Sequence, residues 1–453
     1  MRPHENEEQQ EMLPARIAVV GAGPAGLFAA ADLVRRSDVV VDVIDRVPAP
    51  FGLVRYGVAP DHPKIKSVVR SLQRALEHDR VRFVGNVEYG RDVDRAFLDL
   101  HYDATIFATG ALNSRPLGVA GEDLPGSCSA SDFVSWYNGH PDAVRMFVLD
   151  SQAAAVVGAG NVALDIARLL TRQVGALALT DVPSAVLEAF AASTVRDVHI
   201  LCRRGAAQTK FTTKELLDLR ELRGVGVLVD PEELRDVPAG TGGPVMPNAE
   251  VFRTWAADRV AQQAAPHRIH FHFWSRPAAI EGVERVEALR VERTKLDEEG
   301  AAQGTGEFRA LDVGLVLSSV GYRSNPLPGL PYDPVRGILP NVSGRVVDDR
   351  GTHLSGQYVT GWLKRGPQGV IGTNKADAAE TVTAVLEDLL HPHARSAGAV
   401  DDALTALGAE VIDYVGWQRI DAQEVLRGQA SSRDRAKISD WAELRAIGAG
   451  RSV

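Results

Sequence analysis

Near the start of the chain, apolar runs and a glycine turn follow one another in the order that a nucleotide-binding fold requires. Residues 16–20 form a short, mainly apolar run that ends at Gly21, and residues 24–36 have a helical pattern rich in alanine and leucine. A second apolar run occupies residues 39–44. Strand, turn, helix and strand in this order predict a βαβ unit on a parallel sheet.

The same order of elements returns in the middle of the chain. Residues 153–157 predict a buried strand, a glycine turn follows, and residues 162–170 predict a helix. The next apolar run, residues 197–202, comes late because residues 172–196 intervene. The second βαβ unit therefore has a longer spacing than the first.

Three further apolar runs end in small residues, at 104–110, 313–321 and 356–361. The segment between the first two is self-contained, and the chain returns to the first unit through the third. We therefore predict an α/β protein with two doubly wound, Rossmann-type domains, the second inserted into the first. The predicted division is a flexible tail (1–15), a first domain in two parts (16–110 and 322–453, with a helical C-terminal region from 391) and a second domain (111–321).

The first glycine turn has the sequence GAGPAG at residues 21–26, with Asp45 at the end of the following strand. Such glycines let the backbone approach a pyrophosphate, and the helix N-terminus offers unpaired N–H groups. Asp45 is placed to accept hydrogen bonds from ribose hydroxyls, and it would repel a 2′-phosphate. The turn therefore predicts a site for FAD or NAD and not for NADP.

The second turn has the sequence GAGNVA at residues 158–163, in which Ala163 replaces the third glycine. A small side chain there still permits close packing of helix and strand. Arg203 and Arg204 directly follow the next strand, where guanidinium groups suit a bidentate grip on a 2′-phosphate. Arginines are usually solvated surface residues, but this place at the nucleotide-facing edge of the sheet favours NADP.

Cysteine content limits the redox chemistry. The 453 residues are 45% hydrophobic and 24% charged, as in a globular enzyme, and they include two cysteines, Cys128 and Cys202. Their separation excludes a C-x-x-C dithiol, a cysteine-ligated iron–sulfur cluster and a cysteine-based zinc site. We therefore expect an organic redox cofactor and no metal site.

Net charge and hydropathy limit the kinds of binding partner and the cellular locations that the sequence predicts. The net charge of −9 argues against nucleic acid as a partner. Since no apolar run approaches the roughly 20 residues of a membrane helix, we expect no membrane insertion. Residues 1–15 lack the apolar core of a signal peptide and the arginine-rich composition of a transit peptide, which predicts a cytoplasmic protein.

Several longer motifs resemble those of the adrenodoxin reductase family. They are PFGLVRYGVAPDHP at 50–63, GNVALDIAR at 160–168, RRG at 203–205 with FTTKEL at 211–216, and GWLKRGP at 361–367 with GVIGTN at 369–374. The resemblance extends over about residues 16–390, and more loosely into the tail at 417–421. It is closest to the bacterial ferredoxin–NADP reductases of this group.

This resemblance implies FAD in the first domain, NADPH in the second, hydride transfer between them, and single-electron transfer to a ferredoxin, an iron–sulfur protein. With the glycines of the first turn, the expected FAD contacts are Gly21, Gly23, Ala25, Gly26, Asp45, Leu53, Trp362, Gly369, Val370 and Ile371. The expected NADP contacts are Arg115, Gly160, Asn161, Val162, Arg203, Arg204, Glu215 and Gly369.

The resemblance also implies acid–base residues. The family's histidine that matches His62 lies near the flavin with an acidic partner, and the partner position falls on Asp218, where the family more often has glutamate. Asp165, on the second nucleotide helix, is a further candidate near the nicotinamide. Because hydride transfer itself needs no acid or base, we expect these residues to tune rates.

The sequence also suggests where a ferredoxin would bind and which other functions stay open. Since ferredoxins are typically acidic, the docking surface should be basic. Candidate residues in the second domain are Lys214, Arg220, Arg223, Arg253 and Arg259. A disulfide reductase of the thioredoxin reductase kind is excluded by the missing C-x-x-C. A reductase subunit of a larger enzyme, such as that of glutamate synthase, and an NADP-binding sensor without turnover stay open as alternatives.

Overall fold

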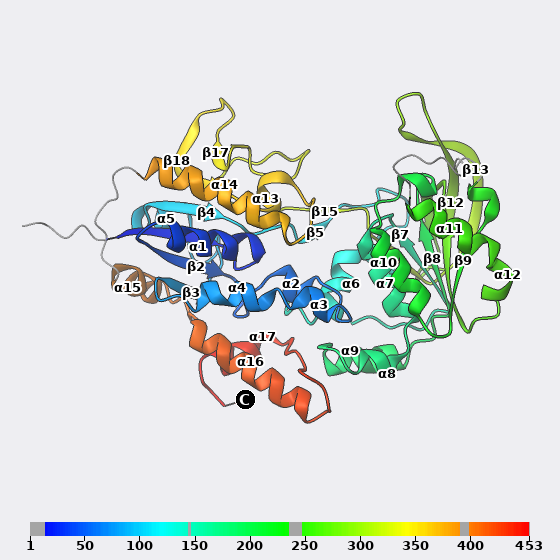
Figure 1. The fold of residues 1–453 in the computed structure, drawn as a ribbon, viewed down its shortest axis with the longest axis horizontal. Coiled ribbons are helices and arrows are strands. Elements are labelled where there is room, and N and C mark those ends of the chain that lie inside the picture. The colour runs from blue at the N-terminus through cyan, green and yellow to red at the C-terminus, as the bar shows by residue number, and fades with distance from the viewer. Residues whose placement is uncertain (1–13, 144–145, 235–246, 390–397, 453) are drawn as a thin grey trace, which may run out of the picture.

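The computed structural model describes residues 14–143, 146–234, 247–389 and 398–452. Two α/β lobes lie side by side along the long axis of the molecule, and the last helices lie below the first lobe (Figure 1). Most of the predicted flexible tail, residues 1–13, lies outside the described residues.

The first sheet has seven strands in the order β16-β17-β18-β4-β1-β2-β3. Neighbours from β18 to β3 pair in parallel, and β16 and β17 extend the β18 edge with antiparallel pairs. The strands are β1 Ala15–Val20, β2 Val39–Asp45, β3 Val81–Gly85, β4 Ala104–Phe107, β16 Asn341–Val342, β17 Arg345–Val347 and β18 His353–Val359.

Helices cover this sheet, so that all residues of β1 are buried, as in parallel sheets that are covered on both faces. Helix α1 packs against both α4 and α14. The helices of this lobe are α1 Pro24–Arg36, α2 Leu53–Tyr56, α3 Pro63–Lys66, α4 Val69–Leu76, α5 Arg95–His101, α13 Trp362–Arg365, α14 Thr373–Asp388, α15 Gly398–Ala406, α16 Tyr414–Gln429 and α17 Trp441–Gly448.

The second sheet has six parallel strands in the order β6-β14-β7-β8-β10-β9. They are β6 Ser127–Ser129, β7 Ala153–Val157, β8 Asp197–Leu201, β9 Val225–Val229, β10 His267–His272 and β14 Leu315–Ser318. The helices are α6 Ala130–Tyr137, α7 Asn161–Thr171, α8 Val174–Leu177, α9 Ser184–Ala191, α10 Thr213–Asp218, α11 Pro247–Ala257 and α12 Arg259–Gln262, with 3₁₀ turns η1 Ala206–Gln208, η2 Leu219–Glu221 and η3 Pro231–Leu234.

The chain passes between the two sheets twice, through a short antiparallel pair formed by β5 (Asn113–Ser114) and β15 (Tyr322–Arg323). Strands of the first sheet precede β5 and follow β15, so the second sheet is inserted into the first in chain order. This agrees with the predicted fold class of two Rossmann-type units. The domain bounds 16–110, 111–321 and 322–453 stay a prediction.

Two parts of the fold were not predicted from the hydrophobic pattern. An antiparallel sheet of β11 (Ser275–Glu281), β12 (Ala288–Leu296) and β13 (Ala302–Asp312) lies beside the second sheet. The late return of the chain to β8 is explained by α8 and α9, which occupy the intervening segment. No described helix is both long enough and apolar enough to span a bilayer, and the cytoplasmic location stays a prediction.

The C-terminal helices belong to the core of the first lobe. Trp417 and Ile420 of α16 are buried together with Ile438 and Leu444 in the same hydrophobic cluster as β1. The Trp417 ring meets Phe51 edge-on, with ring centroids 5.8 Å apart. The C-terminal segment is therefore packed against the first nucleotide unit.

Three histidines of the second sheet lie over one another. The ring centroid of His199 on β8 lies 4.5 Å from that of His270 and 5.2 Å from that of His272, both on β10. The nitrogen atoms His199 Nδ1 and His272 Nε2 are 2.9 Å apart, and Arg309 donates to His272 Nδ1. Burial lowers the pKa of His199 to about 4, and burial and Arg309 hold that of His272 well below 6.5.

This cluster predicts a pH dependence of stability. The unfolded chain takes up these protons near the ordinary histidine pKa and the folded protein does so only at lower pH, so stability falls as the pH drops below about 6.5. In urea unfolding we expect His199 alone to account for roughly 1–2 kcal/mol of the loss between pH 6.5 and 5. The variant His199→Gln should lose that part of the dependence, and the control His78→Gln in the first lobe should keep it. Equal pH slopes in both variants would contradict this account.

Candidate nucleotide-binding and active site

A cavity of about 770 Å³ is lined by residues of both lobes. It lies where the first strands of the two Rossmann-type units end, which is the usual place for a ligand in such sheets. Among the predicted site residues, its walls contain Gly21, Gly23, Ala25, Asp45, Leu53, His62, Asn161, Val162, Asp165, Glu215, Trp362, Gly369, Val370 and Ile371. Those outside its walls are Gly26, Arg115, Gly160, Arg203, Arg204 and Asp218.

The first glycine turn leaves the N-terminus of α1 open toward this cavity. Gly21 has a φ of +117°, and a Cβ atom there would lie 2.5 Å from the carbonyl oxygen of Ala108. A Cβ at Gly26 would collide with the carbonyl oxygen of Gly21, so Gly26 serves the close packing of helix and strand and not the cavity wall. No side chain caps α1 at Gly23, so its first N–H groups are available to an anion.

Asp45 ends β2 and is held by the backbone of the glycine turn. One carboxylate oxygen accepts a hydrogen bond from Ala22 N at 2.6 Å, and the other accepts from Val47 N at 2.9 Å. Burial raises the pKa of Asp45, and these two hydrogen bonds oppose that rise. Because each carboxylate oxygen can accept a second hydrogen bond, Asp45 can also receive ribose hydroxyl groups.

Helix α10 begins with an arrangement that turns Glu215 toward the first lobe. The Thr212 hydroxyl accepts from Glu215 N, as an N-cap residue does. In a capping box the glutamate would in turn accept from Thr212 N, but here Asn161 Oδ1 accepts that hydrogen bond, at 2.9 Å. The Glu215 carboxylate is therefore released to contact His62.

His62 lies between two carboxylates of the second lobe. His62 Nε2 is 3.1 Å from Asp165 Oδ1 and 3.2 Å from Glu215 Oε2. Burial lowers the pKa of His62, but the hydrogen bonds to Asp165 and Glu215 outweigh it and raise that pKa from 6.5 to about 9. Arg168 Nη2 lies 2.6 Å from the same Nε2, and its positive charge opposes this rise without cancelling it.

The structure does not place Asp218 beside His62. Asp218 is the last residue of α10, one helical turn beyond Glu215, and among the described residues His62 has its ion pairs with Asp165 and Glu215. Glu215 is buried in the first turn, where its longer side chain reaches the imidazole. Glu215, predicted as an NADP contact, is thus the glutamate that faces His62.

The ion pair of Arg168 with Asp61 holds this cluster together. Arg168 Nε and Nη2 bind the two oxygens of Asp61 at 2.6 and 2.9 Å, and Arg168 Nη2 also lies 2.7 Å from Asp165 Oδ1. Ligand atoms of His62, Asp165 and Glu215 come within 4.8 Å of one another, as in some metal sites. Because the Arg168 guanidinium already supplies the positive charge between them, we assign no metal ion to this cluster.

Arg203 and Arg204, which follow β8, could bind an anion. Arg204 Nε is buried without a hydrogen-bond partner, and Arg203 is exposed with no ion pair among the described residues. Their backbone is fixed, since Arg203 O accepts from Thr294 Oγ1 and Arg204 O accepts from Trp274 N. Arg115 is exposed beside the interdomain strand β5, outside the cavity wall.

Some cavity residues were missed by the sequence analysis. Tyr322 on β15 lies against Trp362, with ring centroids 5.7 Å apart, and both line the cavity. Tyr56 and His140, one from each lobe, meet edge-on with ring centroids 4.7 Å apart. Tyr56 lies in the motif at 50–63, but no motif marks Tyr322 or His140. For Tyr322 the available signal was its place directly after the apolar run that ends at Gly321.

Comparisons with known proteins show the family of this chain. Residues 15–230 match the family model described as pyridine nucleotide-disulphide oxidoreductase. The NADPH-ferredoxin reductase FprA of Mycobacterium tuberculosis is 42% identical over 97% of this chain and 100% of its own length. The mitochondrial NADPH:adrenodoxin oxidoreductase of Arabidopsis thaliana is 37% identical, with 96% of each chain covered. The chain belongs to the adrenodoxin reductase-like family of ferredoxin reductases.

A solved structure from this family has the same fold. The structure of Mycobacterium tuberculosis FprA in complex with NADPH has a TM-score of 0.91 and 42% sequence identity, covering 96% of this chain and 100% of that one. Cys128 and Cys202, the two cysteines of this adrenodoxin reductase-like chain, are not joined by a disulfide. Neither cysteine is among the described residues that line the cavity.

The residues of this adrenodoxin reductase-like chain fit two nucleotides. The uncapped start of α1 and the buried Asp45 suit a pyrophosphate and a ribose with free hydroxyls, as in FAD. The unpaired Arg204 Nε and the exposed Arg203 suit the 2′-phosphate of NADP. The opposite charges of the two ribose sites argue against exchange of the nucleotides between them.

The contacts of His62 give a test by titration. In Glu215→Gln one of the two carboxylates that stabilise the imidazolium is lost, so we expect the His62 pKa to fall by roughly one unit or more. Histidine-labelled protein followed by NMR measures this pKa, and His62→Gln identifies the resonance. Asp218→Asn is the matched control and should leave the pKa of His62 unchanged. A fall in Asp218→Asn without one in Glu215→Gln would refute the assignment of Glu215.

Proposed function

We propose that this protein is an NADPH–ferredoxin reductase that binds FAD in its first lobe and NADPH in its second. The observation that carries the proposal is one cavity with walls from both nucleotide units. Asp45 lines it in the first lobe, and in the second lobe Arg204, whose Nε has no hydrogen-bond partner, lies outside its wall. The names of the two relatives above support the same activity. FAD, when bound, accepts electrons in pairs and releases them singly.

The chain's own residues bind and orient the two nucleotides. We assign the FAD pyrophosphate to the open start of α1 and the FAD ribose to Asp45. The NADP 2′-phosphate is assigned to Arg203 and Arg204, and the start of α7 at Asn161 to the NADP pyrophosphate. Tyr322 and Trp362 form an apolar wall that excludes water from the reacting rings.

His62 holds a proton beside the reacting rings. We assign a proton to the His62 imidazole at neutral pH, because Asp165 and Glu215 raise its pKa to about 9 against the opposing charge of Arg168. We propose that this charge tunes the rate of electron transfer and that hydride transfer does not depend on it.

Ferredoxin is proposed to dock on the basic surface around α10 and η2. Lys214, Arg220 and Arg223 are exposed and form no ion pair within the described residues. Two other predicted docking residues are less suited, because Arg253 pairs with Glu250 and Arg259 pairs with Asp230. Since α10 also carries Glu215 in the cavity wall, this surface adjoins the reacting site.

Cofactor preference tests the assignment of the second site. Arg203→Ala removes a charge-assisted contact to the 2′-phosphate, so we expect kcat/KM for NADPH to fall roughly 10- to 100-fold while that for NADH stays the same. Arg196→Ala, which replaces the arginine at the opposite end of β8, is the matched control and should change neither value. The site assignment fails if the wild-type protein strongly prefers NADH, or if Arg203→Ala keeps the wild-type preference.

Salt and charge reversal test the docking surface. Arg220→Glu should raise the KM for an acidic ferredoxin several-fold at low salt, on the order of 1 kcal/mol, and should weaken the salt dependence of that KM. NADPH oxidation with ferricyanide, a small acceptor, should stay at the wild-type rate. Arg35→Glu, an exposed change on α1, serves as the control. A ferredoxin KM that is independent of salt in the wild type would contradict docking by charge.

A further inference from the structure

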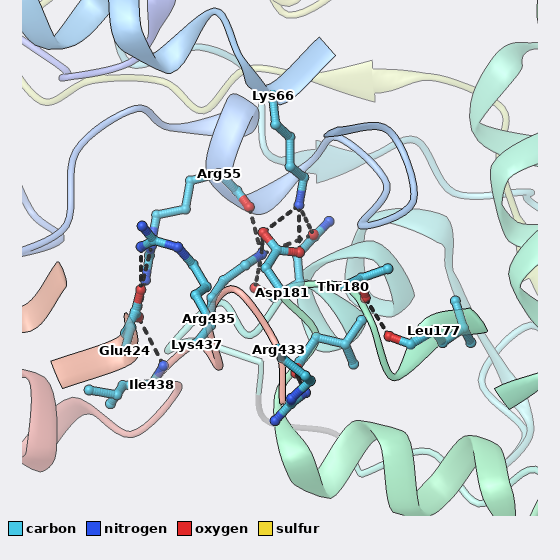
Figure 2. Close-up of polar contacts among 12 residues, drawn as sticks. Arg55, Lys66, Leu177, Thr180, Asp181, Glu424, Arg433, Arg435, Lys437 and Ile438 are labelled. Carbon is cyan, nitrogen blue, oxygen red and sulfur yellow. Dashed lines mark hydrogen bonds and ion pairs between the residues drawn. The ribbon is translucent and has the colours of Figure 1, made fainter. Parts of the chain in front are cut away.

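The loop after α16, residues 430–438, contacts both lobes without lining the cavity. Figure 2 shows Lys437 of this loop beside Arg55 of α2 in the first lobe and beside Asp181, between α8 and α9, in the second. The loop itself is held on α16, because Ala436 N donates to Glu424 O and Ile438 N donates to Glu424 Oε1. We call these nine residues the 430–438 loop.

Lys437 is the residue of this loop that contacts both lobes at once. Its ammonium group donates to Arg55 O at 3.0 Å in the first lobe, and to Asn138 O at 2.9 Å and Asn138 Oδ1 at 3.2 Å in the second. The side chain is only 1% exposed, and burial lowers its pKa well below the ordinary lysine value, which Asp181 opposes. Separating the two lobes would break hydrogen bonds of this buried ammonium group, and leaving a buried charge without its partners costs free energy.

Asp181 of the second lobe binds lysines from two other parts of the chain. Its carboxylate accepts from Lys66 of α3 at 2.7 and 2.8 Å and lies 3.2 Å from Lys437 Nζ. Burial raises the pKa of Asp181, but the two lysines outweigh it and lower that pKa to about 2. Asp181 therefore stays charged over the whole physiological range.

A second arginine of the loop extends this contact along the second lobe. Arg433 donates to Val182 O at 2.7 Å and to the Ser184 hydroxyl at 3.1 Å. By contrast, Arg435 binds Asp421 and Glu424 within the C-terminal segment. Arg433 and Lys437 thus reach the second lobe, whereas Arg435 pairs with two carboxylates of α16.

The partners of Lys437 are neighbours of the cavity wall. Arg55 lies between Val54 and Tyr56, which both line the cavity, and Asn138 lies two residues before His140, which lines it from the second lobe. Tyr56 and His140 are in ring contact across the two lobes. Lys437 therefore connects backbone next to both cavity walls, although it does not itself line the cavity.

We propose that Lys437 is a positioning residue for hydride transfer, because it fixes the separation of the two cavity walls on which the flavin and the nicotinamide are carried. The proposal rests on the proposed function. Hydride transfer depends steeply on the distance of the reacting atoms, and misplacement by about 1 Å can cost 100-fold in rate. Nucleotide binding depends on contacts within each lobe and should be insensitive to Lys437.

The kinetic test uses the FAD-loaded enzyme. In Lys437→Met, which removes the three hydrogen bonds at similar side-chain length, we expect the limiting rate of flavin reduction by NADPH in anaerobic stopped flow to fall roughly 10- to 100-fold. FAD content and the Kd for NADPH should stay at wild-type values. The matched control Arg435→Met, which alters the same segment without touching the second lobe, should keep the wild-type rate. Unchanged reduction in Lys437→Met, or slowing that only follows loss of FAD, would overturn the proposal.

A distance measurement tests the same proposal without turnover. Spin labels at Ser71→Cys on α4 and Gln263→Cys after α12 report the separation of the lobes, in a background with Cys128→Ser. We expect one narrow distance in the parent and in Arg435→Met, and a broader distribution in Lys437→Met and in Asp181→Asn. Identical distributions in all four proteins would refute the proposal. If NADPH fails to reduce the wild-type flavin but the distribution broadens, the proposed function fails and the role of Lys437 in holding the lobes stands.

Discussion

The buried ion pair between Arg168 and Asp61 is the contact on which the active-site geometry depends. Arg168 belongs to α7 of the second lobe and Asp61 to the loop before α3 of the first, and their side chains are 3% and 2% exposed. Removing one partner of such a pair leaves an uncompensated buried charge, at a cost of roughly 3–5 kcal/mol. The pair therefore resists any movement that separates the loop from the helix. His62, next to Asp61, is held against Asp165 and Glu215 as a consequence.

The Arg168–Asp61 ion pair helps to explain how two separate nucleotide-binding units form one electron-transfer site. Each unit could bind its nucleotide alone, through a glycine turn and a ribose-reading residue. Hydride transfer needs residues of both lobes in one cavity, and the polar contacts between the lobes, at Arg168 and at Lys437, supply that arrangement. The acidic residue at one ribose site and the arginines at the other then decide which nucleotide binds in which lobe.

The features that were predictable from the sequence are local ones. The glycine turns, Asp45 and the two arginines after β8 act through residues close to them in the chain, so their spacing was informative. Spacing alone could not show whether Glu215 or Asp218 faces His62. The outcome depends on a contact between residues far apart in the chain, because Asn161 Oδ1 accepts the hydrogen bond from Thr212 N and leaves the Glu215 carboxylate open to His62. Lys437 was also unpredictable, since a lone lysine in a polar stretch gives no sign that tertiary contacts bury it.

An anaerobic titration of the purified protein with NADPH, followed by visible absorbance, tests the central claim most directly. The account predicts a yellow protein whose flavin bands bleach with NADPH, and whose reduction of cytochrome c is stimulated when a ferredoxin is added. A colourless protein that binds NADPH, or a flavin that NADPH does not bleach, would contradict it and would favour a nucleotide-binding sensor.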